Sequence, residues 1–454
     1  MFDLGIEGGT VVGPHGSTRT NVYAADGRVA LLSTDIHPCS QRVDAGGLLV
    51  MPGMVDVHVH LMDPGATDRE DFPAGTAAAA RAGVTTIIEH THARPVRSVS
   101  DLSDKVAYLH DRSRVDFGLG AHAWPDMIHE IPRLWGEGIT FFKAFTCTTH
   151  GVPGLDAAHM LRLFSAIKAA GAICLVHCEE ETITAETERE LREAGRQDPL
   201  VIVEWRSRAA ELTSLSVVSL LARLTGANAV MAHVSSSEAL EVVHRERTKG
   251  APVVTESCPQ YLCLLEEEII IEGPFRKFTP PARGRNDEEL AAMWEALARR
   301  DIDYIATDHA PATKAQKTEG SIWDVHFGLP GLDTTLPVLL DAASAGVISY
   351  ERVVEAYAAV PARVYGLYPR KGDLTQGGDA DVILVDPAAR WTVSNEDILS
   401  KAGWSPFAGR TLSGLAVRTY LRGRLIADEG KVVGEPGVGA FLRGPGARRA
   451  REVS

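Results

Sequence analysis

Eight short apolar segments recur along the middle of the chain, and each is followed by a stretch with helical periodicity or turn residues. They are MVDVHVH (54–60), VTTIIEH (84–90), VDFGLGA (115–121), ITFFKAF (139–145), AICLVHC (172–178), AVMAHVS (229–235), PVVTESC (252–258) and DYIATDH (303–309). Strands that alternate with helices indicate repeated units around a parallel sheet. Eight such units predict an α/β fold, a TIM-type (β/α)8 barrel over residues 53–370.

The stretch LDAAHMLRLFSAIKAAG (155–171) shows the helical periodicity most clearly. The apolar residues that fall on one face of this helix are Met160, Leu163, Phe164 and Ile167. Gly171 follows at a position where a helix C-terminus favours glycine, directly before the next apolar segment. The pattern predicts a helix that packs its apolar face on the sheet.

The two ends of the chain have a different sequence pattern. Short β-prone runs are broken by Gly, Asn and Asp, as in antiparallel strands and turns. These runs are DLGIEGGTVV, NVYAADGRVALLS and QRVDAGGLLV near the start, and DADVILVD (379–386) and VRTYLRGRLIADEGKVV (417–433) near the end. We expect residues 1–52 and 371–435 to form one small β-sandwich domain, followed by a C-terminal tail over 436–454.

The composition limits the classes of partner. A formal net charge of −14 disfavours binding to nucleic acid and to anionic lipid. No apolar run reaches the roughly 18 residues of a membrane span, and the first residues do not resemble a signal peptide. The six cysteines show no regular spacing. These observations predict a cytoplasmic protein with reduced thiols that acts on a small molecule.

The segment VDVHVHL (55–61) has histidines where an apolar strand would carry valines. Side chains two residues apart in a strand point to the same face, so His58 and His60 should emerge side by side. A pair of imidazoles can hold a metal ion. A buried histidine that has found hydrogen-bond partners in the core is the alternative interpretation, and this pair alone leaves it open.

Further polar residues stand near the ends of the other predicted strands, where the active sites of such barrels lie. The full set is His58, His60, Lys143, His177, His233 and Asp308. Taken singly, Lys143 could extend its ammonium to the surface, the histidines could be core residues, and Asp308 could cap a helix. Their common place at strand ends of one barrel favours a shared metal site.

The motifs around these residues resemble the amidohydrolase superfamily, and within it the binuclear cyclic amidohydrolases: hydantoinases, dihydropyrimidinases, allantoinases and dihydroorotases. The segments that match at the site are PGMVDVHVHL, FKAF, LVHCE, MAHVSS and TDHAP. Further matches are ETITAE, CPQYL (258–262), KFTPPAR (277–283), GLPGLDTTLP (328–337) and GGDADVILVD (377–386). The resemblance therefore spans most of the chain.

The resemblance implies two divalent metal ions, with zinc expected, bridged by hydroxide and by a carboxylated Lys143. His58, His60 and Asp308 would hold the more buried ion. The other ion would be bound by His177 and His233. Burial lowers the pKa of a lysine, so a neutral Lys143 amine can react with carbon dioxide to form the bridging carbamate.

In this family the metal-bridging hydroxide attacks the carbonyl of a cyclic amide. Asp308 would be the catalytic residue that takes the proton and passes it to the departing ring nitrogen. The family also implies a homo-oligomer, commonly a tetramer.

Dihydroorotases in this family recognise a substrate carboxylate through an arginine two residues after the second metal histidine, an asparagine after the second strand and a histidine four residues after the aspartate. Here those places hold Met62, EHTHARP (89–95) and Ala312. Loss of a bidentate guanidinium contact removes the strongest interaction of that kind, which disfavours dihydroorotate. Arg94 or Arg283 would have to substitute.

Hydantoinases and dihydropyrimidinases carry a tyrosine five residues after the bridging lysine, placed to donate to the developing oxyanion. Here that place is Thr148, and the stretch FKAFTCTTHG is more similar to allantoinases. The substrate contacts that the resemblance suggests are Met62, His92, Thr148, Thr279 and Arg283.

Three further histidines, His90, His92 and His150, stand near predicted strand ends. They could donate hydrogen bonds to substrate oxygens or be ordinary loop histidines, and the sequence leaves both interpretations open. The expected substrate is an uncharged or weakly charged cyclic ureide or imide. A five-membered hydantoin or allantoin ring is favoured over a six-membered dihydropyrimidine.

The expected function is therefore hydrolysis of a carbon–nitrogen bond in a cyclic amide, of the hydantoinase or allantoinase kind. Dihydropyrimidinase or dihydroorotase activity is the alternative within the same class. A non-catalytic oligomeric scaffold of the same fold is the alternative of another class. Such scaffolds lack metal ligands, whereas this chain retains the full set, which favours an enzyme.

Overall fold

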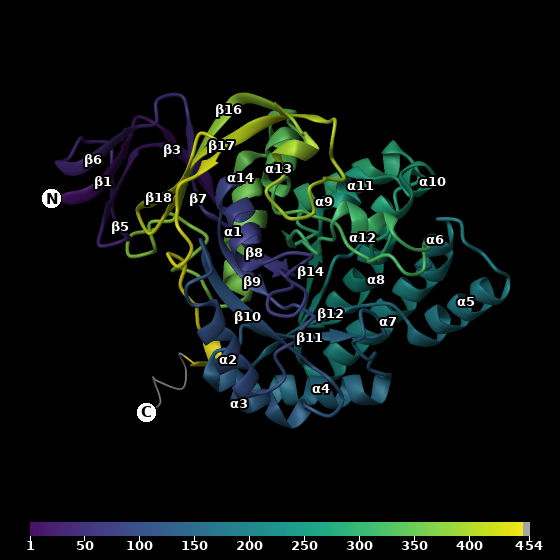
Figure 1. Cartoon of the computed structure of the whole chain (residues 1–454). Helices are drawn as coiled ribbons and strands as arrows, with labels where there is room; N and C mark the ends of the chain where they lie inside the picture. Colours follow the sequence, from purple (N-terminus) through teal and green to yellow (C-terminus); the bar gives the residue numbers. More distant parts are fainter. Residues whose placement is uncertain (448–454) are drawn as a thin grey trace.

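The computed structural model describes residues 1–447 and contains the predicted barrel (Figure 1). Eight strands form one parallel sheet in the order β15-β14-β13-β12-β11-β10-β9-β8. Their bounds are β8 Met54–Val59, β9 Val84–Glu89, β10 Asp116–His122, β11 Phe141–Phe145, β12 Ile173–His177, β13 Asn228–Met231, β14 Val253–Ser257 and β15 Tyr304–Ile305. Each strand overlaps the segment predicted for it, so the α/β barrel is confirmed.

The first and last strands of the sheet meet and nearly close the barrel. Val59 forms a parallel bridge with His309, and the His60 amide donates to the His309 carbonyl at 2.8 Å. The carboxyl ends of all the strands therefore surround one space, where His58 and the residues after β15 come together.

Helices lie between and around the strands (Figure 1). They are α1 Phe72–Arg81, α2 Val99–Leu109, α3 Ile131–Glu137, α4 Ala157–Ala170, α5 Glu181–Glu193, α6 Val201–Trp205, α7 Arg208–Thr225, α8 Ser237–Arg247, α9 Pro259–Cys263, α10 Glu268–Glu272, α11 Asp287–Arg299, α12 Lys314–Thr318, α13 Thr335–Ser344, α14 Tyr350–Val354 and α15 Val360–Val364. Shorter helical turns are η1 Ile128–Glu130, η2 Gly273–Arg276, η3 Glu355–Ala359 and η4 Asn395–Asp397.

Helix α4 confirms the periodicity seen in the sequence. The side chains that it buries are Met160, Leu163, Phe164 and Ile167. Asp156 caps the first turn by accepting from the His159 amide, and Gly171 ends the helix with a φ of 64°.

The ends of the chain form two further sheets beside the barrel, where purple N-terminal strands lie next to yellow C-terminal ones (Figure 1). One sheet has the order β5-β4-β1-β6 and the other β19-β18-β17-β16-β7-β2-β3. The bounds are β1 Phe2–Glu7, β2 Thr10–Gly13, β3 Gly16–Arg19, β4 Asn21–Ala25, β5 Arg28–Ser33, β6 Cys39–Asp44, β7 Leu49–Pro52, β16 Val382–Thr392, β17 Thr411–Leu421, β18 Arg424–Asp428 and β19 Lys431–Val432. Residues of both sheets share one apolar core, so both chain ends build these sheets together.

A buried charge network joins these sheets to the barrel. The Lys371 ammonium lies 2.6 Å from both Asp116 Oδ2 of β10 and Asp381 Oδ2, which precedes β16. It also lies 2.9 Å from Asp379 Oδ2, and Arg422 pairs with Asp116. The three carboxylates are close enough to hold a cation, but Lys371 already supplies the positive charge among them.

The first part of the predicted tail lies along the barrel. Phe441 forms a bridge with Phe117 of β10, and the Leu442 amide donates to the Phe117 carbonyl at 2.7 Å. Leu442 and Ala447 are buried. Residues 448–454 of the predicted tail lie outside the described residues.

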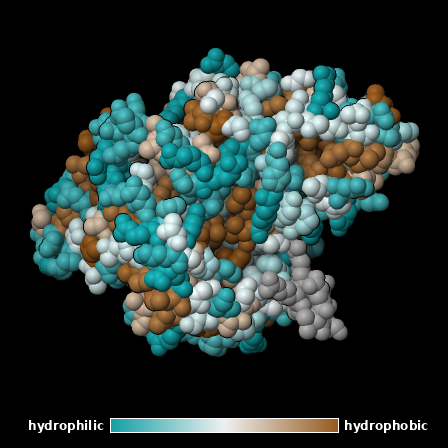
Figure 2. Space-filling view, turned by 180° about the vertical axis from the view of Figure 1, so that it is seen from behind, coloured by the Kyte–Doolittle hydropathy of each residue, from teal (hydrophilic) through white to brown (hydrophobic). Residues whose placement is uncertain are grey.

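From behind, the surface is largely hydrophilic, with hydrophobic residues in separate patches (Figure 2). The most exposed large apolar side chains after Met1 include Ile36, Leu224, Ile270 and Ile271. Among the described residues, no helix combines the length and apolar character needed to cross a membrane.

Candidate active site

The side chains that the sequence assigns to strand ends come together at one end of the barrel. They are His58 in β8, His60 after β8, Lys143 in β11, His177 at the end of β12, His233 after β13 and Asp308 after β15. All of them line a single cavity. The other lining residues are His92, Phe145, His150, Phe278, Thr279, Ala310, Phe327 and Gly328.

One group of the predicted metal ligands is built around Asp308. Its Oδ1 atom lies 3.1 Å from His58 Nε2 and 3.3 Å from His60 Nε2. The Lys143 Nζ atom is 3.4 Å from His58 Nε2. Because Lys143 is only 1% exposed, its ammonium does not reach the surface, and the snorkelling alternative is excluded.

A second group is formed by His177 and His233. Their facing nitrogens, His177 Nδ1 and His233 Nε2, are 2.9 Å apart. The ring of His233 also lies 5.6 Å from the ring of His58, centre to centre. The two groups therefore adjoin in the same cavity.

The backbone turns sharply where two of these residues leave their strands. His233 has a φ of 39° and Asp308 a φ of 48°, in the left-handed region that residues other than glycine rarely adopt. Such strained positions cluster at functional sites, where the surrounding structure holds them. Here the turns direct both side chains into the cavity.

Glu256 in β14 supports both groups and was not among the residues predicted from the sequence. Its Oε1 atom accepts from His58 Nδ1 at 2.6 Å and from the His233 amide at 3.2 Å. Its Oε2 atom accepts from the Tyr304 hydroxyl at 2.8 Å. The signal was present, because PVVTESC places a charged residue inside an apolar strand, as FKAF does with Lys143.

Glu179, just after β12, supports the second group and was also missed. Its Oε2 atom lies 2.7 Å from His177 Nε2 and accepts from the Thr279 hydroxyl at 2.7 Å and from Arg206 Nη1 at 3.3 Å. Burial by itself would raise the pKa of Glu179, but Arg206 and His177 outweigh it and lower the pKa to about 2. Glu179 is therefore an ionised acceptor.

Burial sets the protonation of the cavity residues. It lowers the pKa of Lys143, although Asp308 and Glu256 oppose the shift. It also lowers the pKa of His60 to about 4, and that of His233 to well below its usual value. Burial would raise the pKa of Asp308, but His58 and His60 overcome it and hold the pKa well below the ordinary range.

The result is neutral His60, His177 and His233 rings, an ionised Asp308 and a lysine that gives up its proton more easily than usual. Burial and Lys143 would lower the pKa of His58, but Glu256 and Asp308 outweigh them and raise it. His58 Nδ1 and His177 Nε2 are each occupied by a glutamate, so the opposite nitrogen of each ring faces the cavity. A carboxylate behind a histidine is the usual arrangement around a protein metal ion. The donor set fits divalent cations that accept imidazole and carboxylate ligands.

Comparison with known proteins places the chain in a family. A model of the amidohydrolase family matches residues 49–426. The chain is 32% identical to an L-hydantoinase of Paenarthrobacter aurescens over 100% of both chains, and 34% identical to an allantoinase of Rubrobacter xylanophilus over 97% of this chain and 98% of that protein. The chain belongs to the amidohydrolase family. Its full-length relatives group it with the cyclic amidohydrolases.

The folds of solved relatives agree with the fold of this chain. The structure of an L-hydantoinase (dihydropyrimidinase) from Arthrobacter aurescens superposes with a TM-score of 0.94 at 32% identity, covering 98% of this chain and 100% of that chain. A D-hydantoinase structure superposes with a TM-score of 0.90 at 28% identity, covering 97% and 98%. The chain therefore shares the whole architecture of these proteins.

In this amidohydrolase the suggested substrate contacts separate into two groups. His92 and Thr279 line the cavity. Met62, Thr148 and Arg283 do not line it.

Local structure explains where these three side chains are. Met62 has a φ of 57° and is buried, with the Thr91 hydroxyl donating to its sulfur at 3.4 Å. Thr148 is exposed and borders a separate hollow. Arg283 Nη2 donates to the Arg206 carbonyl at 2.6 Å, and its Nε lies 3.4 Å from Glu211.

The additional histidines of this amidohydrolase also fall into two groups: two line the cavity and one does not. His150 stacks on His92 with ring centres 4.4 Å apart and an interplanar angle of 19°, and both rings line the cavity. Burial lowers the pKa of both rings well below the usual value, so both are neutral. Each neutral ring offers one donor and one acceptor.

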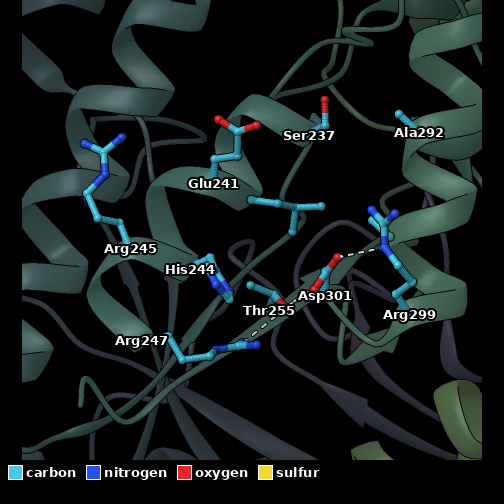
Figure 3. Close-up of a pocket in the computed structure, with 11 residues that line it drawn as sticks. Ser237, Glu241, His244, Arg245, Arg247, Thr255, Ala292, Arg299 and Asp301 are labelled. Atoms are coloured by element: carbon cyan, nitrogen blue, oxygen red, sulfur yellow. Dashed lines mark hydrogen bonds and ion pairs between the residues drawn. The ribbon is translucent and has the colours of Figure 1, made fainter. Parts of the chain in front are cut away.

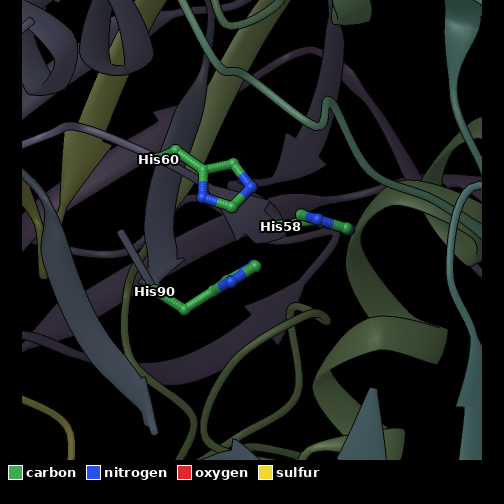
Figure 4. Close-up of side chains that lie close together, drawn as sticks. All are labelled: His58, His60 and His90. Atoms are coloured by element: carbon green, nitrogen blue, oxygen red, sulfur yellow. The ribbon is translucent and has the colours of Figure 1, made fainter. Parts of the chain in front are cut away.

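His90 lies beside the first pair of histidines rather than in the cavity lining (Figure 4). Its ring centre is 4.7 Å from that of His58 and 4.3 Å from that of His60. One ligand atom from each of these residues falls within 4.8 Å of the others, a spacing that could hold a cation. His90 was among the residues whose role the sequence left open.

A larger hollow lies away from this cavity, between α8 and α11 (Figure 3). Two of its charged side chains pair with neighbours: Arg247 Nη2 lies 2.5 Å from Asp303 Oδ2, and Arg299 Nε lies 3.4 Å from Asp301 Oδ2. None of the predicted site residues lines this hollow. The barrel cavity therefore remains the candidate active site.

Proposed function

We propose that this chain opens the ring of an uncharged cyclic ureide, of the hydantoin or allantoin kind, by hydrolysis of a ring carbon–nitrogen bond. The observation that carries the proposal is the meeting of the predicted metal ligands around one cavity. Full-length similarity to an L-hydantoinase and an allantoinase supports it.

The cavity residues suit two divalent ions, for which we propose zinc. His58, His60 and Asp308 would hold one ion, and His177 and His233 the other. Lys143 would bridge the two as a carbamate. Burial lowers the pKa of Lys143, which favours the neutral amine; its nitrogen bonds to the carbon of carbon dioxide and a proton is released.

When bound, the two ions supply an activated water and polarise the ring carbonyl. Asp308 is proposed to accept the proton of that water and to deliver it to the departing ring nitrogen. Its carboxylate is ionised at neutral pH because His58 and His60 hold its pKa well below the ordinary range, against the effect of burial. An ionised carboxylate at the cavity wall is a suitable proton acceptor.

His92 and Thr279 are the proposed substrate contacts, and the stacked His150 joins them. Because His92 and His150 are neutral, they can bind amide and ureido groups without favouring a carboxylate. The places where dihydroorotases carry an arginine and a histidine hold Met62 and Ala312 here. Both observations favour an uncharged ureide over dihydroorotate.

A six-membered dihydropyrimidine ring is the second candidate. The observation in its favour is the similarity to a solved L-hydantoinase that is also described as a dihydropyrimidinase. A homotetramer remains a family-based expectation.

Hydrolysis of four compounds tests the proposal: hydantoin, allantoin, dihydrouracil and dihydroorotate. The protein should be depleted of metal and then reconstituted with zinc and bicarbonate, so that each compound is assayed with and without ions. We expect ring opening of hydantoin or allantoin only in the reconstituted protein. Rapid turnover of dihydroorotate would contradict the proposed substrate class, and a reconstituted protein that opens none of the rings would support the non-catalytic scaffold.

A further inference from the structure

Two buried lysines, Lys277 and Lys317, hold the segment that closes one side of the cavity. We call residues 321–328 the rim segment. We propose that Lys277 is a positioning residue, whose ammonium fixes the rim segment so that Phe327 and Gly328 form a cavity wall that fits the ring substrate. The effect on catalysis rests on the proposed function, whereas the structural effect does not.

The ammonium of Lys277 is fully engaged by the rim segment. Its Nζ atom donates to the carbonyls of Ile322 at 2.7 Å, Trp323 at 3.1 Å and Val325 at 2.6 Å. A lysine ammonium has three N–H donors, so this geometry uses all of them. The Lys277 backbone joins in, because its carbonyl accepts from the Gly328 amide at 3.0 Å.

Lys317 of α12 reinforces the same arrangement from the other side. Its Nζ atom donates to the carbonyls of Lys277 at 3.0 Å, His326 at 2.9 Å and Gly328 at 3.2 Å. Lys317 therefore contacts both the Lys277 backbone and the rim segment, and it holds the two together.

These two lysines differ from two other buried lysines of the chain, Lys105 and Lys371. Lys105 pairs with Glu89, and Lys371 lies among aspartates. The acceptors of Lys277 and Lys317 in the described residues are all backbone carbonyls. A buried charge is costly unless it is satisfied, and the Lys277 ammonium is satisfied by the three rim-segment carbonyls rather than by a carboxylate.

The rim segment reaches the substrate side of the cavity directly. Phe327 and Gly328 line it, and the Lys277 ammonium lies 4.5 Å from the centre of the Phe327 ring. The same ring lies 5.9 Å from that of His150 at 86°. Gly328 has a φ of 115°, and a Cβ there would lie 2.1 Å from the Ala310 carbonyl oxygen. The wall therefore leaves no room for a side chain at position 328.

The apolar side chains of the rim segment pack against helices beside the cavity. They form a small cluster separate from the barrel core, composed of Leu191, Val201, Ile202, Trp205, Ile269, Ile322, Trp323, Val325 and Phe327. Trp205 precedes Arg206, which supports Glu179 behind His177. The rim segment thus packs against the elements that hold the second histidine group.

The charge of Lys277 is sensitive to mildly alkaline pH. Burial lowers its pKa to about 8, with Asp324 opposing the shift. The charged groups that face it are Asp324 of the rim segment, Glu188 and Arg192 of α5, Arg206 after α6 and Lys317 of α12. As the pH rises through about 8 the ammonium loses a donor and its charge, so the hold on the rim segment should weaken above that pH.

Hydrogen–deuterium exchange of the metal-loaded protein without substrate tests the structural part. Lys277→Met keeps a long side chain and removes the ammonium, so the rim segment amides should exchange about 10-fold faster. Lys314→Met, at an exposed position of the same helix as Lys317, is the matched control and should leave the exchange unchanged. Equal exchange in the wild type and Lys277→Met would overturn the inference.

Steady-state kinetics on the preferred ureide tests the catalytic part. Lys277→Met should raise KM about 10-fold, keep kcat within about 3-fold and leave the metal content unchanged, because the wall binds the substrate but does not touch the ions. A fall in kcat at unchanged KM would contradict a role in positioning the wall. If the wild type opens no ureide, the proposed function fails, while the exchange experiment still decides the structural part.

The wild type provides a test that does not depend on any variant folding. Between about pH 7 and pH 9.5, after correction for the intrinsic exchange rate, protection should fall in the rim segment and persist in α4. Unchanged protection of the rim segment across this range would overturn the inference.

Discussion

The inner end of the cavity and its outer wall are built in different ways. The inner end consists of side chains from strand ends, supported by carboxylates of neighbouring strands, as Glu256 supports His58. The outer wall consists of loop residues, with His150 stacked on His92 and Phe327 held through the rim segment. Rigid strands suit the chemistry, and loops suit the choice of substrate.

This difference predicts two kinds of variant. Changes at the inner end should lower metal content and kcat together, because they disturb the ions or the residues that hold them. Changes in the outer wall should alter KM or the preference among substrates and leave the ions in place.

The largest effect is expected for Lys143→Ala, which removes the proposed bridge between the ions. We expect kcat/KM to fall about 1,000-fold or more, with loss of most bound metal. Elemental analysis and ureide hydrolysis measure the two effects. Lys168→Ala, at an exposed position of α4, is the control and should match the wild type. Full metal content and activity in Lys143→Ala would contradict the inner-end assignment.

Glu256→Gln should have the next largest effect. Both carboxylate oxygens of Glu256 accept hydrogen bonds, so the amide of glutamine would set an N–H against a donor in either orientation. We expect about 10- to 100-fold weaker metal binding, measured by competition with a chelator.

Glu179→Gln provides the internal comparison. Only Oε2 of Glu179 has hydrogen-bond partners among the described residues, so a glutamine can keep its oxygen there. The loss of metal affinity should therefore be smaller than in Glu256→Gln. A larger loss of metal affinity in Glu179→Gln than in Glu256→Gln would show that the charge on Glu179, rather than acceptor geometry, supports the ions.

A change in the outer wall should act on substrate preference. His150→Phe preserves the stacked shape against His92 and removes hydrogen-bonding atoms. Allantoin carries a ureido substituent that hydantoin lacks, so the ratio of kcat/KM for allantoin to that for hydantoin should fall about 10-fold. Metal content should stay at the wild-type level. An unchanged ratio would remove His150 from the substrate contacts.

The smallest effect is expected in the hollow between α8 and α11. Arg299→Ala removes a side chain whose charge is already paired with Asp301 and Glu295. Activity should stay within about 2-fold of the wild type, since surface ion pairs contribute little. A large loss of activity would show that the hollow takes part in function.

The barrel and the inner end could be predicted from the sequence for one physical reason. A polar residue in a buried strand is conspicuous, and the period of a strand fixes the face to which it points. His58, Lys143 and Asp308 were found in this way. Glu256 carried the same signal in PVVTESC and could have been included.

The outer wall could be predicted only in part, because loop geometry decides which side chains reach the cavity. His92 and Thr279 were predicted and line it, whereas Met62, Thr148 and Arg283 do not. A positive φ at Met62 and a hydrogen bond to its sulfur keep that side chain in the interior. Arg283 is held by Glu211 and a backbone carbonyl, which its place in KFTPPAR does not reveal. The carbonyl contacts of Lys277 join residues more than forty positions apart through backbone atoms, so no side-chain pattern marks them.

Anomalous diffraction at the zinc edge, from crystals of the protein supplied with zinc and bicarbonate, tests the central claim most directly. We expect two peaks per chain, one beside His58, His60 and Asp308 and one beside His177 and His233. We also expect density that extends from Lys143 Nζ to both peaks. No peak at either place, or an unmodified Lys143 amine turned away from the histidines, would contradict that claim.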